Sequence, residues 1–536
     1  MTKVTSKARF SEIVLKFLSD LSYIPYMEKV LILDFGSQYT QLIARRIREQ
    51  HVYCEIWPCQ RSFSEIKAFQ AKAIVLSGGP ASILKKGSPQ IDKRIFNLNL
   101  PILGICYGMQ LMTKVFGGKI VSAKSREYGP AKLFFKEKHR LFSQVQDHST
   151  VWMSHGDSIE QLPKYFKLIA QTQDHIPAAM VHGTKPFFAL QFHPEVHHTQ
   201  FGKTVLKNFL FRVAKLKPDW NMHDFISEEC EKVYQIVGKD HVILGLSGGV
   251  DSSVAAVLIH KAIGNQLTCI FINNGLLRHN EEKRVQKLFK SHYKMKLHYV
   301  DAASKFLKEL KGVSDPEKKR KIIGRVFIEV FEKEAEKIKD AKFLAQGTLY
   351  PDVIESISFK GPSSVIKSHH NVGGLPKKMG LKILEPLREL FKDEVRELGK
   401  VLKMPEEMLS RHPFPGPGLG IRIMGEVTKK RLDLVRKANH IVMQEIKTSG
   451  WYHKVWQAFA VLLPIQSVGV MGDERTYENV CALRVVDSVD GMTAHWVDLP
   501  QGLLTRISNR IINEVRGINR VVYDISSKPP ATIEWE

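Results

Sequence analysis

Short runs of hydrophobic residues alternate with longer segments of mixed polarity along most of the chain. Four of these runs end in glycine or polar residues, and we interpret them as buried strands that lead into functional loops, at residues 29–35, 72–79, 101–106 and 188–193. Because helix-like segments separate them, the pattern predicts an α/β domain whose sheet is mostly parallel and flanked by helices.

A second series of the same kind follows a break at 215–221, "KLKPDWN", which we interpret as a linker. Its strand candidates lie at residues 241–246, 267–274, 297–302 and 343–348. Strands that alternate with helices again predict a doubly wound parallel sheet.

The stretch "HPFPGPGLG", residues 412–420, contains three prolines and three glycines. No helix or strand interior tolerates that composition, so it predicts an ordered connection. Helix-like and strand-like pieces then follow, which predicts a small α+β domain. We therefore expect four parts: an N-terminal extension that can be disordered (1–27), two α/β domains (28–216 and 217–413) and the C-terminal domain (414–536).

Composition supports a globular protein of several domains, since 536 residues are too many for one core. Six scattered cysteines have neither zinc-ligand spacing nor a dense disulfide pattern, which favours a reducing, cytoplasmic location. No apolar run approaches the roughly 20 residues that span a bilayer, so we expect no membrane partner.

The net charge is +24, from 79 Lys and Arg against 55 Asp and Glu. The basic residues form short clusters rather than one long arm, and no zinc-finger or aromatic-basic RNA-recognition pattern is visible. The charge therefore favours anionic small substrates, and we expect no nucleic-acid partner.

The sequence "GICYGMQ" places Cys106 between Gly104 and Gly108, where a predicted strand ends. This is the pattern of a nucleophile on a sharp strand-to-helix turn, in which small residues let the backbone bend. The next N–H group, from Tyr107, then points at the carbonyl under attack, and a second donor can come from "SGGP" at 77–80.

A thiol nucleophile needs a base, and "QFHPEV" places His193 and Glu195 two positions apart at another strand end. In an extended segment these side chains point to the same side, so Glu195 can orient an imidazole that faces Cys106.

In this order, "SGGP", "GICYGMQ", "MSHGD" and "QFHPE" resemble the class I glutamine amidotransferases over residues 28–215. The resemblance implies hydrolysis of glutamine to glutamate and ammonia through a thioester on Cys106, with His193 as base and Glu195 as its orienting group. Gly79 and Tyr107 are the expected oxyanion donors, although the choice between Gly78 and Gly79 stays open.

The same resemblance implies three residues that line the glutamine pocket: Gln110, Ser154 and His155.

The loop "SGGVDSS" lies between a predicted strand and a predicted helix, where glycines, hydroxyls and helix N–H groups suit an anion. It lacks the lysine that a γ-phosphoryl-transfer loop carries, so a whole pyrophosphate leaving group fits it better. The expected ATP-binding residues are Ser247, Gly248, Gly249, Val250, Asp251, Ser252 and Ser253. A carboxylate beside phosphates suggests Mg²⁺ brought with ATP as the metal near Asp251. We expect no organic prosthetic group.

This loop resembles the PP-loop ATP pyrophosphatases, which adenylate a substrate oxygen. Further segments, above all "HPFPGPGLG" and the final "KPPATIEWE", resemble the glutamine-hydrolysing GMP synthetase family from about residue 28 onward. That resemblance implies a carbon–nitrogen ligase acting on xanthosine monophosphate (XMP), ATP and glutamine. ATP adenylates the purine 2-oxygen with release of pyrophosphate, and ammonia displaces AMP to give GMP.

The resemblance also implies a homodimer formed through the C-terminal domain. For XMP we predict phosphate contacts from Arg320 and Lys528 and base contacts from Ile533 and Glu534, because cations suit a phosphate dianion.

Some alternatives stay open. His369 and His370 are either phosphate contacts or plain loop residues. Asn273 stands where related enzymes carry an acidic residue, which could change ATP or Mg²⁺ binding. Three rival functions remain. The intact Cys106 motif counts against a glutamine-dependent NAD synthetase and against a non-enzymatic nucleotide-binding protein. A tRNA-modifying PP-loop enzyme often has paired catalytic cysteines, and Cys230 and Cys269 lack that arrangement.

Overall fold

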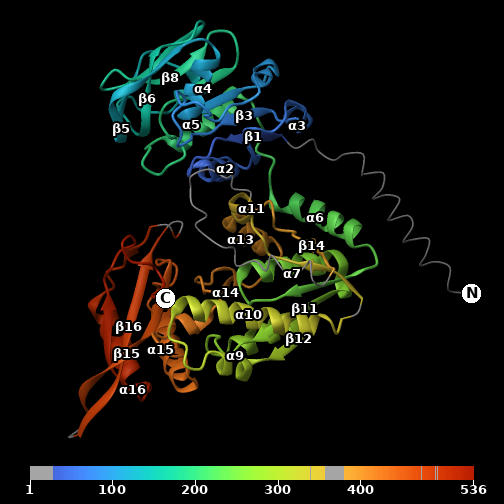
Figure 1. Cartoon of the computed structure of the whole chain (residues 1–536), viewed down its shortest axis with the longest axis vertical. Helices are drawn as coiled ribbons and strands as arrows, with labels where there is room; N and C mark the ends of the chain where they lie inside the picture. The colour runs from blue at the N-terminus through green and yellow to red at the C-terminus, as the bar shows by residue number, and fades with distance from the viewer. Residues whose placement is uncertain (1–27, 339, 357–379, 472–473, 489–490, 492) are drawn as a thin grey trace, which may run out of the picture. The chain divides into compact units, whose positions relative to one another are not determined.

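The computed structural model describes residues 28–338, 340–356, 380–471, 474–488, 491 and 493–536. The expected extension, residues 1–27, lies outside this part of the chain, and so do His369 and His370. The chain forms two compact units, one that ends at Asn221 and one that runs from Met222 to Glu536 (Figure 1).

The first unit contains a sheet of nine described strands in the order β2-β1-β3-β4-β9-β8-β7-β5-β6 (Figure 1). Its strands are β1 (Lys29–Asp34), β2 (Tyr53–Pro58), β3 (Ala73–Leu76), β4 (Ile102–Ile105), β5 (Lys119–Phe135), β6 (Thr150–Gln161), β7 (Phe166–Thr172), β8 (Pro177–His182) and β9 (Phe187–Leu190). From β2 to β9 the neighbours are parallel, and from β9 to β6 they are antiparallel. The four predicted strands are β1, β3, β4 and β9, so their carboxyl ends meet at one edge.

Helices cover this sheet and are α2 (Thr40–Arg48), α3 (Phe63–Ala68), α4 (Tyr107–Val115) and α5 (Gly202–Asn208), with short turns η1 (Lys93–Asn97), η2 (Arg140–Phe142) and η3 (Phe209–Val213). The central strands β3 and β4 are buried at every position, which explains their continuous apolar sequence. Met109 and Met112 of α4 pack into the same core as Ile74 and Ile102, so α4 is fixed directly after β4.

The second unit contains a parallel sheet with five described strands in the order β12-β11-β10-β13-β14. Its strands are β10 (His241–Gly245), β11 (Leu267–Asn273), β12 (Lys296–Asp301), β13 (Ala341–Ala345) and β14 (Lys382–Leu384). The first four are the predicted strands. β14 was not predicted, because its three residues are too few to show a strand pattern. The chain order reverses between β10 and β13, and ligands bind at such a point beyond the carboxyl ends of the strands.

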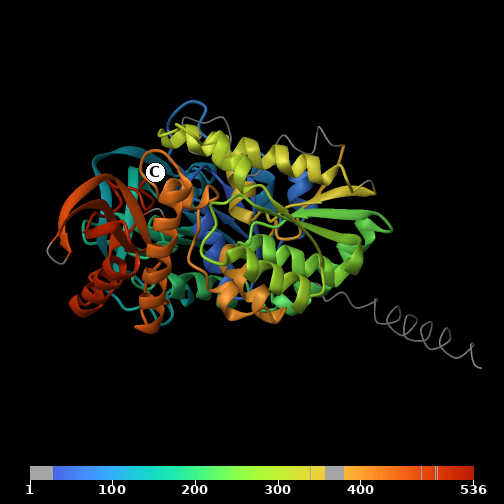
Figure 2. The same ribbon diagram turned by 90° about the horizontal axis from the view of Figure 1, so that it is seen from below.

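The helices around this sheet are α6 (Met222–Val237), α7 (Val250–Ile263), α8 (Glu281–Gln286), α9 (Ala303–Glu309), α10 (Pro316–Ala335), α11 (Tyr350–Ser356), α13 (Lys392–Val401) and α14 (Glu406–Leu409), with short turns η4 (Gly264–Gln266) and η5 (Lys287–His292). Helices α6, α7 and α13 pack on one another, and α10 packs against α9 and β11. Figure 2 shows that α10 begins close to the C-terminus of the chain.

A second, mostly antiparallel sheet closes the unit. Its strands are β15 (Gln457–Met471), β16 (Glu474–Asp487), β17 (His495–Trp496) and β18 (Ile518–Asp524), accompanied by α15 (Lys429–Thr448), α16 (Gln501–Glu514) and the turn η6 (Gly418–Ile421). β16 pairs with β15 and β17 in antiparallel orientation and with β18 in parallel. No helix in the described ranges is both long and apolar enough to cross a bilayer.

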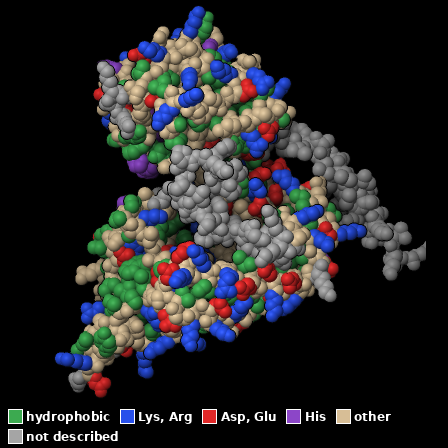
Figure 3. All heavy atoms as spheres, viewed as in Figure 1, with side chains coloured by type: hydrophobic (Ala, Val, Ile, Leu, Met, Phe, Trp, Pro, Cys, Tyr) green, Lys and Arg blue, Asp and Glu red, His purple; other side chains and the backbone are tan. Residues whose placement is uncertain are grey.

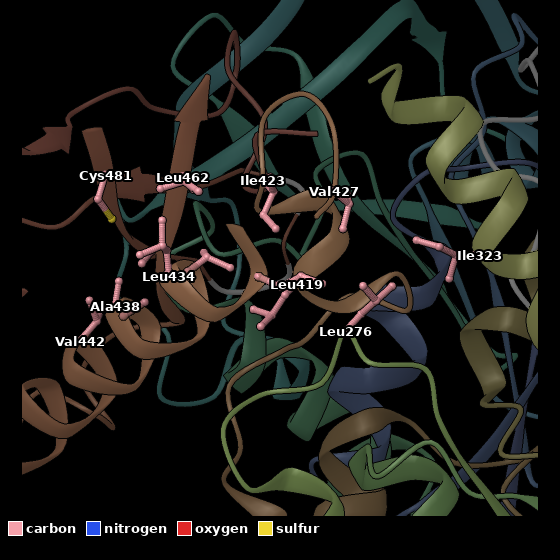
Figure 4. Close-up of a cluster of buried hydrophobic side chains, with 14 of the residues drawn as sticks. Leu276, Ile323, Leu419, Ile423, Val427, Leu434, Ala438, Val442, Leu462 and Cys481 are labelled. Atoms are coloured by element: carbon pink, nitrogen blue, oxygen red, sulfur yellow. The ribbon is translucent and has the colours of Figure 1, made fainter. Parts of the chain in front are cut away.

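One hydrophobic core joins the five-stranded sheet to the C-terminal sheet. Figure 4 shows Leu276 and Ile323 from the first part beside Leu419, Ile423 and Leu462 from the second. The Pro/Gly-rich stretch runs through this core: at Gly418, whose φ is +62°, a Cβ would lie 2.5 Å from the carbonyl oxygen of Leu276. The stretch is therefore an ordered connection, as predicted, and it fixes the C-terminal sheet to the nucleotide-loop region.

Candidate active sites

Cys106 lies on a sharp turn between β4 and α4. Its backbone has φ 50° and ψ −101°, a conformation that residues other than glycine rarely adopt. A Cβ on Gly108 would approach the carbonyl oxygen of Leu76 to 2.5 Å, and one on Gly104 would approach Gly108 to 2.7 Å. The two glycines are therefore sterically required, and the turn presents the sulfur at the carboxyl edge of the sheet.

His193 and Glu195 lie next to this turn and are buried. His193 Nδ1 is 2.7 Å from Glu195 Oε1, and the Cys106 side chain lies beside the ring. Thr199 Oγ1 donates to the His193 carbonyl oxygen at 2.6 Å, and the Tyr39 ring packs edge-on to the imidazole. The structure thus brings the three predicted catalytic side chains together in the order nucleophile, base, orienting carboxylate.

The charge state of His193 follows from its neighbours. Burial alone would lower its pKa, but the Glu195 carboxylate and the Cys106 thiol outweigh burial and raise the pKa of His193 well above 6.5. An imidazole with that environment takes a proton from the thiol readily, which is the function of a base beside a nucleophile.

Two glycines of "SGGP" contact this group of residues in different ways. A Cβ on Gly78 would lie 3.0 Å from His193 Cε1, whereas one on Gly79 would lie 3.3 Å from Tyr107 Cγ and 2.8 Å from the Phe35 carbonyl oxygen. Tyr107 is the first residue of α4, so its N–H has no partner within the helix. Gly79 therefore lies beside Tyr107, an arrangement that suits the predicted pair of oxyanion donors.

The three predicted glutamine-pocket residues lie on β6 and α4. Ser154 approaches Cys106 through its backbone, since its carbonyl oxygen is 3.7 Å from Cys106 Sγ. Gln110 Nε2 donates to the Asp157 carbonyl oxygen at 3.1 Å, and the same oxygen is 3.0 Å from His155 Nδ1. The other His155 nitrogen is 3.0 Å from Glu127 Oε2, and the Asp157 carbonyl oxygen joins Gln110 to His155.

The loop "SGGVDSS" joins β10 to α7 as predicted. Its hydroxyls bond within the loop: Ser247 Oγ and Ser252 Oγ are 2.9 Å apart, and the Gly249 N–H donates to Ser247 Oγ. Ser253 is completely buried and its hydroxyl donates to the Gly249 carbonyl oxygen at 2.6 Å. Ser247 and Ser252 thus lie on the exposed side of the loop, whereas Ser253 stabilises its turn.

A cavity of about 260 Å³ lies beside this loop at the carboxyl ends of β10 and β11. Four basic side chains from three separate segments line it: Arg278, Lys392, Arg396 and Arg411. Sequence analysis missed them because they come from loops and helices that only the fold brings together. A cavity with a glycine-rich loop on one side and several cations on the other suits a polyphosphate.

Arg411 connects the loop to the Pro/Gly-rich stretch. It donates to the Gly248 carbonyl oxygen at 2.7 Å and pairs with the buried Glu281 carboxylate. The φ of Gly248 is +76°, a backbone conformation that glycine adopts without strain. Arg411 therefore fixes the backbone of the nucleotide loop from outside.

Asp251 is a fitting ligand for a metal that arrives with phosphates. Its Oδ1 is buried without a hydrogen-bond partner among the described residues, and Lys392 Nζ is 3.8 Å from Oδ2. Burial raises the pKa of Asp251, the nearby Asp352 carboxylate adds to the rise, and Lys392 opposes it. In the described ranges no cluster of three or more His, Cys, Asp or Glu could hold a metal by itself, so a cation here would need phosphate oxygens as well.

Asn273 stands where an acidic residue was expected, and its side chain bonds other groups of the protein. Its Nδ2 donates to the Tyr299 hydroxyl at 3.2 Å, and its Oδ1 accepts from the Gly275 N–H at 3.0 Å. The neighbouring Asn274 lines the cavity instead.

The C-terminal residues are held by buried cations that sequence analysis did not identify. Arg422 is 2% exposed and donates to Glu534 at 2.9 Å, and Gln457 Nε2 donates to the same carboxylate at 2.7 Å. Lys319 is completely buried between the Ile423 carbonyl oxygen and Glu536. A buried cation requires such a partner, which explains why the acidic tail folds back onto α10 and η6.

Of the four predicted XMP contacts, three lie on or against this tail. Arg320 donates to the Glu536 carbonyl oxygen, and Ile533 packs against Phe459 and Val461. The Glu534 carboxylate is already hydrogen-bonded, so a purine N–H would have to share it. Lys528 lies at the base of the tail, where its Nζ donates to the Gly491 carbonyl oxygen at 2.8 Å.

His412 supplies a pH-dependent prediction. It is stacked on Tyr452 with ring centroids 4.2 Å apart, its Nε2 is 2.7 Å from the Tyr452 carbonyl oxygen, and burial lowers its pKa to about 4. Between pH 6.5 and 4 the His412 imidazole therefore binds a proton in the unfolded chain but not in the folded chain. As the pH falls through this range, the free energy of unfolding decreases by about 3 kcal/mol because of this residue.

His412→Gln keeps a donor for Tyr452 but does not titrate, so it is expected to lose this contribution. Denaturant unfolding at pH 7 and pH 4.5 measures it. The difference in free energy of unfolding between the wild type and His412→Gln should shift in favour of the variant at the lower pH. His495→Gln, at an exposed position, is the control. A gap that is the same at both pH values would contradict the prediction.

Comparison with known proteins gives three matched families along the chain. The profile of "Glutamine amidotransferase class-I" matches residues 31–213, that of "NAD synthase" matches 221–343, and that of "GMP synthase C terminal domain" matches 444–535.

Curated relatives match nearly the whole chain. The "GMP synthase (glutamine-hydrolyzing)" proteins of Brachyspira hyodysenteriae and Maridesulfovibrio salexigens are each 58% identical over 510 residues, which cover 95% of this chain and 99% of each relative. The protein of the same name from Pelodictyon phaeoclathratiforme is 57% identical over 518 residues, covering 95% of this chain and 100% of that relative.

Proposed function

The chain belongs to the glutamine-hydrolysing GMP synthase family, and from this membership we propose that it makes GMP from XMP with nitrogen from glutamine and energy from ATP. The observation that supports the proposal most strongly is that one chain contains both the Cys106–His193–Glu195 group and the loop 247–253, which resembles that of the PP-loop ATP pyrophosphatases. The NAD synthase profile matches only the segment around that loop, whereas the GMP synthase relatives match almost the entire chain.

In the glutaminase half-reaction, the Cys106 sulfur attacks the side-chain carbonyl carbon of glutamine while His193 takes the thiol proton. Negative charge develops on the carbonyl oxygen, where the N–H groups of Gly79 and Tyr107 can receive it. His193 then gives the proton to the departing ammonia, and water hydrolyses the thioester to release glutamate. Glu195 holds the imidazole and stabilises its charged form through the 2.7 Å contact.

In the synthetase half-reaction, the purine 2-oxygen of XMP attacks the α-phosphorus of ATP and pyrophosphate leaves. The loop 247–253, the N-terminus of α7 and the basic residues of the cavity support this group. Asp251 would hold Mg²⁺, which neutralises phosphate charge when bound with ATP. Ammonia then attacks purine carbon 2, and AMP departs with the oxygen.

For XMP we propose the region where the tail meets α10, with Arg320, Lys528, Ile533 and Glu534 as contacts. The concentration of cations there supports the proposal: Lys319, Arg320 and Arg422 all contact the last three residues of the chain. A phosphate dianion and a purine both find partners in such a mixed surface.

The proposed function is tested by the absorbance change on conversion of XMP to GMP. With ATP and Mg²⁺, either glutamine or ammonium should support the reaction, and omission of ATP should stop both. Nicotinic acid adenine dinucleotide in place of XMP should give no product. Amidation of that compound instead of XMP would overturn the proposal in favour of NAD synthesis.

We further propose that the chain forms a homodimer through its C-terminal sheet. Hydrophobic side chains gather on this sheet (Figure 3), and several are more than half exposed: Ile465, Val468, Val470 and Tyr477. Val468 is the register partner of Tyr477 on the neighbouring strand, and Val470 lies two positions along on the same face. A group of exposed apolar side chains of this kind is typical of an interface.

Replacement of Val468 and Val470 by aspartate is therefore expected to convert a dimer into a monomer, because it places charges in the proposed interface. Analytical ultracentrifugation gives the mass, and circular dichroism checks folding. The control is Ile236→Asp on α6, an apolar residue with 57% exposure. A wild type that sediments as a monomer, or a double variant that stays dimeric, would argue against this interface.

A further inference from the structure

Gln191 is a buried polar residue whose side chain has no structural explanation in the fold alone. It directly follows β9, is 1% exposed, and its backbone N–H donates to the Ala178 carbonyl oxygen at 2.8 Å. Its side-chain Oε1 is buried without a hydrogen-bond partner among the described residues. Leaving a buried amide oxygen unpaired is costly, and such a cost is characteristic of functional positions.

The other end of the same amide contacts the nucleophile. Gln191 Nε2 is 3.8 Å from Cys106 Sγ and is oriented to donate to it. The sulfur therefore has three polar neighbours: the His193 ring, the Ser154 carbonyl oxygen at 3.7 Å, and the Gln191 amide. The carbonyl oxygen can only accept, so it favours the protonated thiol, whereas an N–H donor favours the thiolate.

We propose that Gln191 is a catalytic residue of the glutaminase site, whose N–H stabilises the Cys106 thiolate. The inference rests on the proposed role of Cys106 as nucleophile. When the thiol proton moves to His193, the electron pair left on sulfur receives the Gln191 N–H. When the thioester is later hydrolysed, the carbon–sulfur bond breaks, its electron pair returns to sulfur, and the same N–H receives it before His193 returns the proton.

Burial makes this contact effective. Cys106 is 4% exposed and Gln191 is 1% exposed, so water is largely excluded from the anion and a single donor has a strong effect. The rigid backbone bond of Gln191 to β8 holds the amide in place, which removes the need for reorganisation during the reaction.

Alkylation of Cys106 by iodoacetamide measures this effect, because only the thiolate reacts. The rate, followed against pH by mass spectrometry of the Cys106 peptide, should show a midpoint about one pH unit higher in Gln191→Met than in the wild type, with about tenfold slower alkylation at neutral pH. Gln191→Glu, which adds a negative charge beside the sulfur, should move the midpoint further. Glutamine hydrolysis should lose kcat with little change in KM.

The control variant is Gln171→Met, a buried glutamine on β7 that bonds His175 and not the site. Circular dichroism checks that the first unit is folded in each variant, and ammonium-driven synthesis of GMP in the same preparations should be unchanged. A midpoint that stays in place or falls in Gln191→Met would overturn the inference, since it would mean that the amide oxygen faces the sulfur. Glutamine hydrolysis that survives in Cys106→Ala would instead overturn the proposed nucleophile.

Discussion

Cys106→Ala is expected to abolish glutamine-driven GMP formation and to leave ammonium-driven formation intact. The nucleophile has no substitute nearby, because the other polar neighbours of Sγ are a carbonyl oxygen, an amide and the base itself. Without it no thioester forms, and the loss of glutaminase turnover should be at least about a thousandfold. The synthetase half-reaction needs only ammonia, XMP and ATP, and its proposed residues all lie in the second unit.

The two rates are measured in one preparation by the absorbance change on GMP formation, with glutamine or ammonium as the nitrogen source. Cys59→Ala is the matched control, since Cys59 is a buried cysteine of the same unit that belongs to its hydrophobic core. If Cys106→Ala also lost the ammonium-driven reaction, the proposed division of chemistry between the two units would be wrong.

Arg484→Met is expected to reduce the free energy of unfolding of the second unit by about 3–5 kcal/mol. Arg484 is completely buried, and its guanidinium donates to the carbonyl oxygens of Ser526, Thr532 and Ile533. It also pairs with Asp524 at 3.2 Å. Methionine fills similar space but leaves three carbonyl oxygens without the guanidinium donor and the largely buried Asp524 carboxylate without its cation, which explains the size of the effect.

The same variant should raise KM for XMP more than KM for ATP, because the carbonyls that Arg484 holds belong to the segment of Lys528, Ile533 and Glu534. Denaturant unfolding and steady-state kinetics measure the two effects. Arg520→Met is the control, since Arg520 is exposed on β18 and within the described residues bonds only Ser467 and Val468 of β15. Equal unfolding free energies for Arg484→Met and Arg520→Met would show that the tail does not depend on this guanidinium.

Local patterns were enough to predict a large part of the molecule. The strands β1, β3, β4 and β9 are short apolar runs because both of their faces are buried, and such runs are visible without knowledge of their neighbours. The turn at Cys106 was predictable for a similar reason: a Cβ at Gly104 or Gly108 would collide with backbone only a few residues or one strand away. The pairing of His193 with Glu195 was predictable because side chains two positions apart in an extended segment point to the same side.

Strand β6 shows where local patterns failed. Its alternate buried positions include His155 and Asp157, so its sequence lacks the alternation of apolar and polar residues by which a strand is recognised. The Asp157 carboxylate is tolerated inside because the Ser82 hydroxyl and the Ile83 N–H donate to it, and His155 lies beside the Glu127 carboxylate. These partners come from other elements. Strand β6 was missed on these grounds.

The residues around the chemistry therefore divide into two kinds. Motif residues such as Cys106, His193 and the loop 247–253 are set by short stretches of backbone, and their types and spacing already indicate the reaction. Supporting residues act across long separations: Lys319 meets Glu536 217 positions away, and Arg411 meets Gly248 163 positions away. A lone Lys or Arg in a sequence is usually a solvated surface residue, and only folding buries these particular side chains and makes a partner for each of them necessary.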